Sequence, residues 1–224
     1  MTMRHDAVSD DPEAGRRPVA VRGLAVSRAA ASWLIHRGAS PNAISFAGMV
    51  AGLTAGAAFA STPEVPPAAA RALWLLGALL VQLRLVANLL DGMVALGRGV
   101  ASPAGELWNE VPDRVSDTAV LVGVGLAAGN SALGLAAALA AMATAYVRTA
   151  ARVAGAPADF GGPMAKQHRM AFVAALALWQ SLAPAAWNLG GASVSQWGLA
   201  AIAALSLLTA VRRLARAARA LRSP

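Results

Sequence analysis

The sequence predicts an all-α, polytopic membrane protein with six transmembrane helices and an N-terminal interfacial helix. Of its 224 residues, 57% are hydrophobic and only 13% are charged, and the mean hydropathy is +0.54. These values lie outside the usual range of soluble globular domains. Several apolar runs approach the roughly 20 residues that a helix needs to cross a bilayer. Glycine and alanine are abundant in these runs, as expected where helices pack closely in lipid.

The first 38 residues divide into two segments. Residues 1–20 are polar and mixed in charge, which is typical of a disordered cytoplasmic tail and lacks the apolar core of a signal peptide. In residues 21–38, several apolar side chains share one face of a helix while arginines occupy much of the rest. These are Leu24, Ala31, Leu34 and Ile35, with Trp33 beside them. We therefore expect an amphipathic helix on the membrane surface.

Residues 39–211 form the predicted membrane domain, with six spans bounded by turn residues or charge. The spans are 44–61, 72–96, 115–129, 133–147, 170–187 and 196–211. The third and fourth spans are short and are joined only by Gly129, Asn130 and Ser131, which predicts a helical hairpin. Residues 212–224 form a basic cytoplasmic tail. This tail could attract anionic lipid headgroups or could serve only as a topology anchor.

The basic residues give the predicted spans an orientation. Of the 19 lysines and arginines, all but Arg71 and Arg84 fall on one side of a six-span arrangement. The positive-inside rule places that side, with both termini and the two longer loops, in the cytoplasm. We expect an integral protein of the bacterial inner (plasma) membrane that contacts membrane lipids and no nucleic acid. The chain has no cysteine, which excludes disulfides and thiolate metal sites.

Polar residues interrupt the apolar pattern at the end of the second predicted span. Arg84 and Asn88 precede Asp91 by seven and three residues, so all three side chains share one helix face. An ionisable residue at this depth usually faces a cavity, a partner or a site. Arg84 and Asp91 could also simply neutralise each other inside the bundle.

A second polar stripe follows if a helix begins at Gly105. Its members recur every three or four residues and are Glu106, Asn109, Glu110, Asp113 and Asp117. Four carboxylates on one stripe repel each other unless cations or donors are present. Because this helix leads into the third span, we expect the stripe to face the second span and Asp91, although a solvated face is the alternative. Oxygen ligands without His or Cys suit Mg²⁺ or Mn²⁺, and the usual companion of such an ion is a phosphate.

Eight positions in this region follow a fixed spacing. They are Asn88, Asp91, Gly92, Ala95 and Leu96, and then, after eight residues, Gly105, Asn109 and Asp113. The arrangement resembles the motif D-x-x-D-G-x-x-A-R, eight or nine residues, G-x-x-x-D-x-x-x-D of the CDP-alcohol phosphotransferase (CDP-alcohol phosphatidyltransferase) family. The residues Ser40, Pro41 and Asn42 before the first span extend the resemblance over most of the chain from about Ala39.

Three motif positions differ from the family pattern. Asn88 and Asn109 replace two of its four aspartates, and Leu96 replaces its arginine. Glu110 has a side chain long enough to reach the place that Asn109 leaves. Sliding the match by four residues would pair Asp113 with Asp117, but it puts Asn109 where a glycine belongs, so we prefer the unshifted match.

The resemblance implies transfer of a phosphatidyl (substituted phosphoryl) group from a CDP-activated lipid such as CDP-diacylglycerol to an alcohol acceptor, with release of CMP, in phospholipid biosynthesis. It implies one or two Mg²⁺ or Mn²⁺ ions, with Asp113 as the base on the acceptor. The expected metal ligands are Asn88, Asp91, Asn109, Glu110 and Asp113. The expected nucleotide and diphosphate contacts are Asn88, Asp91, Gly92, Ala95, Arg98 and Gly105.

Other charged residues have more than one interpretation. Arg98 or Arg84 could meet a phosphate in place of the missing arginine, or could serve only topology or helix pairing. Glu106 and Asp117 are expected to support the site. In some family members basic residues of the loop before the fifth span bind a phosphate on the acceptor, and the matching residues here are Arg152, Lys166 and Arg169. Ordinary positive-inside anchoring is the alternative.

The assembly and the class of function also stay open. The resemblance and the small residues of the spans predict a homodimer. A family member without catalysis, acting as a lipid-binding or assembly partner, is one alternative to the enzyme. A small transporter with Arg84, Asn88 and Asp91 as an intramembrane polar path is another. The acids gather at one surface and no discontinuous helix pair is evident, which disfavours the transporter.

Overall fold

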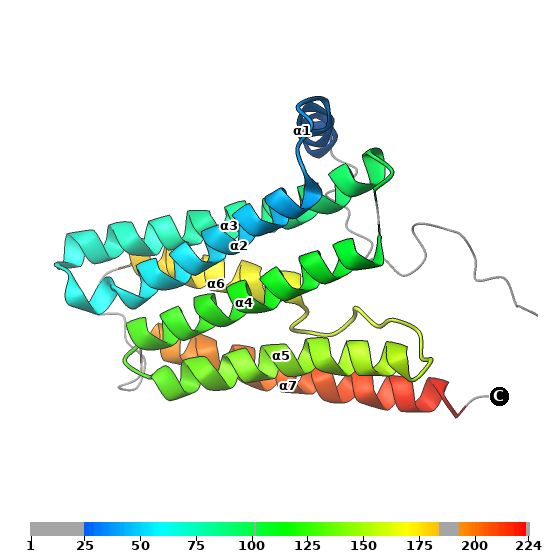
Figure 1. Cartoon of the computed structure of the whole chain (residues 1–224). Coiled ribbons are helices and arrows are strands. Elements are labelled where there is room, and N and C mark those ends of the chain that lie inside the picture. The colour runs from blue at the N-terminus through cyan, green and yellow to red at the C-terminus, as the bar shows by residue number, and fades with distance from the viewer. Residues whose placement is uncertain (1–24, 101, 184–192, 223–224) are drawn as a thin grey trace, which may run out of the picture.

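The computed structural model describes residues 25–100, 102–183 and 193–222, whose regular secondary structure is helical, with no strand among them. The all-α class is therefore confirmed (Figure 1). The helices are α1 (Ala25–His36), α2 (Pro41–Ala60), η2 (Thr62–Glu64), α3 (Pro67–Gly97), α4 (Pro103–Ala127), α5 (Ser131–Val153), α6 (Lys166–Leu182) and α7 (Val194–Ala220). The predicted tail at 1–20 and the end of the fifth span at 184–187 lie outside the described residues.

Helices α2 to α7 lie side by side in a bundle, and α1 lies at one end of it (Figure 1). Helix α2 packs against α3 and α4, α3 against α6, α4 against α5, and α5 against α7. Helix α1 contacts the end of α3, where a Cβ on Gly97 would lie 2.5 Å from Cδ1 of Ile35. The apolar residues of α1 are partly exposed, with Trp33 58% exposed. Its position on a membrane surface remains a prediction.

Four of the described helical segments are long and apolar enough to cross a membrane: Pro41–Glu64, Pro67–Gly97, Ser131–Val153 and Val194–Ala220. This supports an integral membrane protein. Helix α6 has 17 residues, and α4 has four ionisable residues within its last 18 positions. Six spans therefore remain a prediction for this bundle.

Several helix boundaries differ from the sequence prediction, and three of them are informative. Helix α3 begins at Pro67, five residues before the predicted span. Helix α4 begins at Pro103 instead of Gly105, because the Ser102 hydroxyl caps it by accepting a hydrogen bond from the backbone N–H of Gly105 (3.1 Å). Helix α7 continues to Ala220, so most of the predicted basic tail is helical. Alanine and arginine have high helix propensity, which favours this continuation.

Glycines allow α2 and α4 to pack with their backbones in contact. A Cβ on Gly56 would lie 2.4 Å from the carbonyl oxygen of Ala119, and a Cβ on Gly123 would lie 2.2 Å from that of Gly56. No side chain can occupy these positions without moving a helix. Close contact here brings the polar half of α4 toward α2 and α3.

We expect Gly123→Ala to destabilise the bundle by about 1 to 3 kcal/mol, because the added methyl would overlap backbone atoms of α2. Thermal unfolding of the purified protein in detergent measures the effect. Gly105→Ala is the matched control, since the nearest atom to its Cβ is Oγ of Ser102 at 3.4 Å. Equal midpoints for the two variants would contradict the prediction.

The apolar core occupies one half of the bundle and polar residues gather in the other. Phe59 and Trp74 stack with ring centroids 4.9 Å apart, and Val81, Leu121 and Ile202 are fully buried around them. The polar half contains the start of α2, α4 and α6 and the end of α3, α5 and α7. Every bundle helix therefore contributes one terminal half to the same polar region.

Candidate functional site

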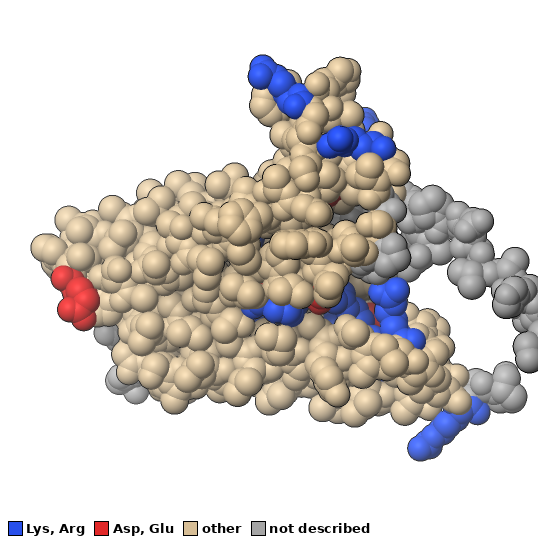
Figure 2. Space-filling model, viewed as in Figure 1, with Lys and Arg blue, Asp and Glu red and all other residues tan. Residues whose placement is uncertain are grey.

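A cavity of about 1130 Å³ lies in the polar half of the bundle. Figure 2 shows lysine, arginine and acidic atoms gathered in a hollow on a surface that is otherwise mostly uncharged. Most of the predicted site residues line this cavity: Asn88, Asp91, Gly92, Ala95, Arg98, Gly105, Asn109, Glu110, Asp113, Lys166 and Arg169. The fold thus brings together residues from α3, α4 and α6 that are up to 81 positions apart.

Three predicted residues lie outside the cavity lining, and the side chain of a fourth is not described. Arg84 and Asp117 are buried beneath the cavity and do not line it. Arg152 is exposed near the end of α5 and is also outside the lining. The side chain of Glu106 lies outside the described part of the structure. The structure therefore does not bring Arg152 to the cavity.

Asp91 contributes a buried carboxylate to the cavity wall. It is 2% exposed, and its Oδ2 accepts a hydrogen bond from the Ser45 hydroxyl of α2 (2.5 Å). Its Oδ1 has no hydrogen-bond partner among the described residues. Among the described residues no ion pair joins it to Arg84, which pairs with Asp113 and Asp117, so the alternative in which Arg84 and Asp91 neutralise each other is not observed.

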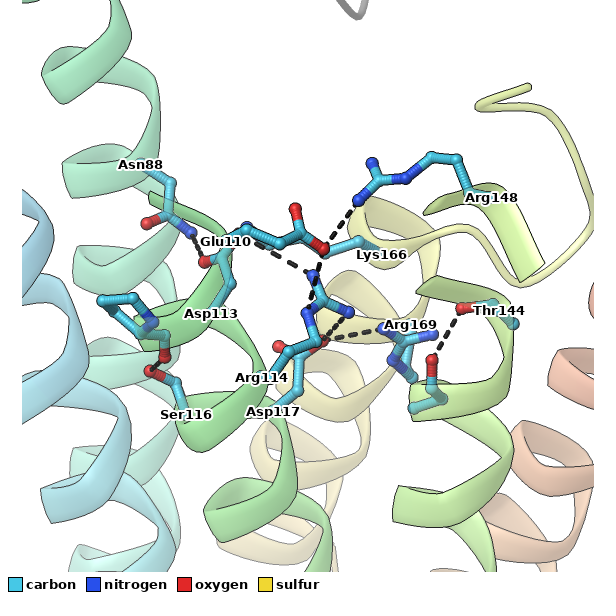
Figure 3. A network of polar contacts seen from close by, with 12 residues as sticks. Asn88, Glu110, Asp113, Arg114, Ser116, Asp117, Thr144, Arg148, Lys166 and Arg169 are labelled. Carbon is cyan, nitrogen blue, oxygen red and sulfur yellow. Dashed lines mark hydrogen bonds and ion pairs between the residues drawn. The ribbon is translucent and has the colours of Figure 1, made fainter. Parts of the chain in front are cut away.

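Asp113 faces α3 from α4, as the helical spacing predicted. Its Oδ1 accepts hydrogen bonds from Nδ2 of Asn88 (2.6 Å) and from Nη2 of Arg84 (3.1 Å). The Lys166 ammonium at the start of α6 contacts Oδ2. Asn88, Asp113 and Lys166 therefore converge from three helices on one point (Figure 3).

A buried ion-pair group supports Asp113 from below. Asp117 lies between Arg84 (2.6 Å) and Arg169 (2.7 Å), and both guanidinium groups are 0% exposed. Charges at such depth are costly unless they are paired. Arg84 also binds Asp113. This ion-pair group therefore holds α3, α4 and α6 against each other directly under the cavity.

Glu110 is held by arginines on the α5 side of the cavity. Its Oε1 lies 2.6 Å from Nη2 of Arg148 and 3.3 Å from Nε of Arg114 (Figure 3). Arg148 also lies over the ring of Phe160, 5.2 Å from its centroid. Glu110 therefore already has two cationic partners, and its role as a metal ligand stays a prediction.

The oxygen atoms of the cavity differ in how well they suit a metal ion. Asp91 fits, because the residue lines the cavity and its buried Oδ1 has no hydrogen-bond partner among the described residues. Asn88 fits beside it, since donating through Nδ2 to Asp113 leaves its own Oδ1 as an acceptor. Asp113 fits poorly because both of its oxygens already meet donors. The described residues contain no group of three or more His, Cys, Asp or Glu that could hold a metal ion.

Lys166 begins α6 and precedes the predicted fifth span. Burial lowers the pKa of its ammonium below the ordinary value, while the neighbouring Asp113 carboxylate raises it. Lys166 therefore places a compact positive charge, carried on a flexible side chain, in the cavity.

Arg98 has a structural role in addition to its predicted one. Its Nη1 donates to the carbonyl oxygens of Gly38 (3.2 Å) and Ala39 (2.7 Å). These bonds hold the link between α1 and α2 against the end of α3. Arg98 thus joins the end of α3 to the link between α1 and α2, and a phosphate contact by Arg98 stays a prediction.

Sequence reasoning missed several residues that the structure places in or around the cavity, and three of them make hydrogen bonds or ion pairs there. Ser45 binds Asp91 and lies one turn into α2, where only its position near the polar end of that helix could have indicated it. Arg148 was grouped with the loop, although it binds Glu110. Arg213 was assigned to the tail, but α7 directs it inward, where it donates to the Thr144 and Gly161 carbonyls (2.9 and 3.0 Å).

The fold is similar to solved structures of one enzyme, the phosphatidylinositol phosphate synthase of Mycobacterium tuberculosis. Its crystal structure with CDP-DAG bound has a TM-score of 0.69 at 21% identity, covering 87% of this chain and 94% of that one. The structure in complex with manganese and citrate has a TM-score of 0.70 at 21% identity, covering 85% and 88%. The apo form has a TM-score of 0.67 at 22% identity, covering 84% and 94%.

No protein-family model matches the chain, and no curated protein matches it either. The similarity therefore lies in the three-dimensional arrangement of the helices. Over most of its length, this chain has the fold of the synthase that was solved with CDP-DAG.

Proposed function

We propose that this protein is a membrane transferase that moves a phosphatidyl (substituted phosphoryl) group from a CDP-activated lipid such as CDP-diacylglycerol to an alcohol, with release of CMP, in phospholipid biosynthesis. The observation that carries the proposal is the convergence of Asn88, Asp91 and Asp113 on one cavity of about 1130 Å³. The motif spacing and the fold of a synthase solved with CDP-DAG support it.

The cavity suits a large anionic headgroup. Its volume of about 1130 Å³ slightly exceeds that of typical ligand pockets, which leaves room for a nucleotide and an acceptor together. Gly92 and Ala95 follow Asp91 on α3 and line the cavity with little side-chain bulk, so a nucleotide can approach the helix closely. The apolar tails would stay between the helices in lipid, with the headgroup at the helix ends.

Asp91 and Asn88 would hold Mg²⁺ or Mn²⁺ through their Oδ1 atoms, with Asn109 and Glu110 as further oxygen donors from α4. When bound, such an ion neutralises diphosphate charge and stabilises the charge that develops as CMP leaves. The synthase structure in complex with manganese supports this choice of ion.

In the proposed reaction, the acceptor oxygen attacks the phosphorus attached to the lipid, and the bond from that phosphorus to the CMP oxygen breaks with its electron pair. Asp113 takes the acceptor proton. Arg84 and Asn88 bind Oδ1 of Asp113, so they orient the carboxylate and leave Oδ2 for the hydroxyl group. Lys166 contacts Oδ2 and is the group that the hydroxyl would have to share or displace.

Three wider features belong to the same proposal. Lys166 and Arg169 both line the cavity and can meet a phosphate on the acceptor, although they already pair with Asp113 and Asp117, and Arg152 lies outside the lining. The positive-inside rule favours a cavity that opens to the cytoplasm. Small-residue helices favour a homodimer.

The direct test is release of CMP from CDP-diacylglycerol by the purified protein, with a panel of alcohols and Mg²⁺ or Mn²⁺. We expect turnover with at least one alcohol and its loss on chelation of the ion. Absence of CMP across the panel would refute the enzyme. Binding of the CDP-lipid without turnover would support a lipid-binding partner, and solute flux into vesicles that depends on Asp91 would support a transporter.

A further inference from the structure

We propose that this chain holds a single divalent ion, at Asp91, and that the Lys166 ammonium takes the place of a second ion at Asp113. The inference deepens the proposed function and rests on it for the nature of the site.

Groups of the protein already contact both carboxylate oxygens of Asp113. Its Oδ1 receives two donors, Nδ2 of Asn88 at 2.6 Å and Nη2 of Arg84 at 3.1 Å, and its Oδ2 meets the Lys166 ammonium. A divalent ion at this carboxylate would have to displace a buried guanidinium or an ammonium and would face their positive charge. The Asp113 carboxylate is therefore already paired with cations of the protein.

The side-chain amide of Asn88 is oriented with its NH₂ group toward Asp113. A carboxylate only accepts hydrogen bonds, so the amide must present its NH₂ group to Asp113 and not its carbonyl oxygen. An NH₂ group carries positive partial charge and cannot ligate a metal ion. The space between Asn88 and Asp113 therefore lacks one of the two oxygen ligands that a bridging ion would need.

Asp91 differs from Asp113 in each of these respects. Its side-chain hydrogen bond comes from the neutral Ser45 hydroxyl, and its Oδ1 is buried without a hydrogen-bond partner among the described residues. A Cβ on Gly48 of α2 would lie 3.7 Å from Oδ1 of Asn88, so that oxygen points toward α2, the helix that also carries Ser45. The remaining oxygen ligands thus gather on the α2 side.

The balance of charged side chains around the cavity also disfavours a second ion. The charged side chains in and directly under the cavity are the cations Arg84, Arg98, Arg114, Arg148, Lys166, Arg169 and Arg213 and the acids Asp91, Glu110, Asp113 and Asp117. They comprise seven cations and four acids before any metal binds. A single divalent ion would about balance a diphosphate diester, whereas a second would leave excess positive charge in a site of low dielectric.

Titration of the purified full-length protein with Mn²⁺, followed by calorimetry and by electron paramagnetic resonance, tests the number of ions without any turnover. We expect one Mn²⁺ per wild-type chain and none with Asp91→Asn. The double variant Asn88→Asp with Lys166→Met restores an acidic ligand and removes the ammonium, so it should bind two. Lys166→Arg keeps a cation and should still bind one.

Arg71→Met is the matched control, since it removes a cation at the opposite end of α3 and should leave one Mn²⁺ bound. Two ions or none in the wild type would overturn the inference, as would a single ion in a double variant with an unchanged thermal midpoint. One ion without CMP release would refute the proposed function and leave this inference standing. CMP release with two ions would do the reverse.

Discussion

Asp113→Asn should lower the rate of CMP release by about 10²- to 10⁴-fold and leave binding of the CDP-lipid mostly intact. The amide has the shape of the carboxylate and can still accept hydrogen bonds from Asn88 and Arg84 through its oxygen. It cannot take a proton from the acceptor. Initial rates of CMP release, together with calorimetric binding of CDP-diacylglycerol, separate the loss of chemistry from a loss of binding.

Asp159→Asn is the control for this variant, because it makes the same change in an acid that pairs with Arg216 and does not line the cavity. Its rate should match that of the wild type. If Asp113→Asn turned over at the wild-type rate, Asp113 would not be the base, and the acceptor proton would have to go to another acid of the α4 stripe.

Asp117→Asn should destabilise the protein by about 3 to 5 kcal/mol, because it leaves two buried guanidinium groups without their shared carboxylate. Arg84 and Arg169 are both 0% exposed and lie 2.6 and 2.7 Å from the Asp117 oxygens. The three residues join α3, α4 and α6, so the loss should affect the whole cavity. Thermal and denaturant unfolding in detergent measure the change in the free energy of unfolding.

The same control, Asp159→Asn, also serves here. The Asp159 carboxylate pairs with Arg216 at 2.7 Å, but the Arg216 side chain is 46% exposed. Pairs of this kind contribute about 0 to 1 kcal/mol. Similar losses of stability in the two variants would show that the buried group under the cavity contributes no more than a surface pair.

Local patterns along the chain predicted much of the fold and much of the site. Apolar composition and the spacing of turns predicted a helical membrane protein, and all the described bundle helices overlap the predicted spans. Helical periodicity placed Asp113 on the face of α4 that meets α3. These features follow from neighbouring residues, because a helix repeats every 3.6 positions whatever it later packs against.

The sequence could not predict which polar side chains pair with each other between helices. Arg84 and Asp91 share a face of α3 and looked like a pair, yet Arg84 binds Asp113 and Asp117, while Asp91 binds Ser45. Lys166 reaches Asp113 across 53 positions of chain. The sequence also did not predict that Ser102 caps α4 or that α7 continues to Ala220. More than one helix boundary is compatible with the local residues, and the packed chain adopts one of them.

The residue pattern thus established the class of fold, the location of the acids and the oxygen-rich chemistry of the cavity. The packing of α2 against α4 and of α3 against α6 decided which carboxylate is neutralised by cations and which one, Asp91, keeps an unpartnered oxygen. The physical reason is the distance along the chain over which each effect acts. Periodicity and hydropathy act over a few residues, whereas an ion pair depends on distances of a few ångströms between helices, which only the packed bundle defines.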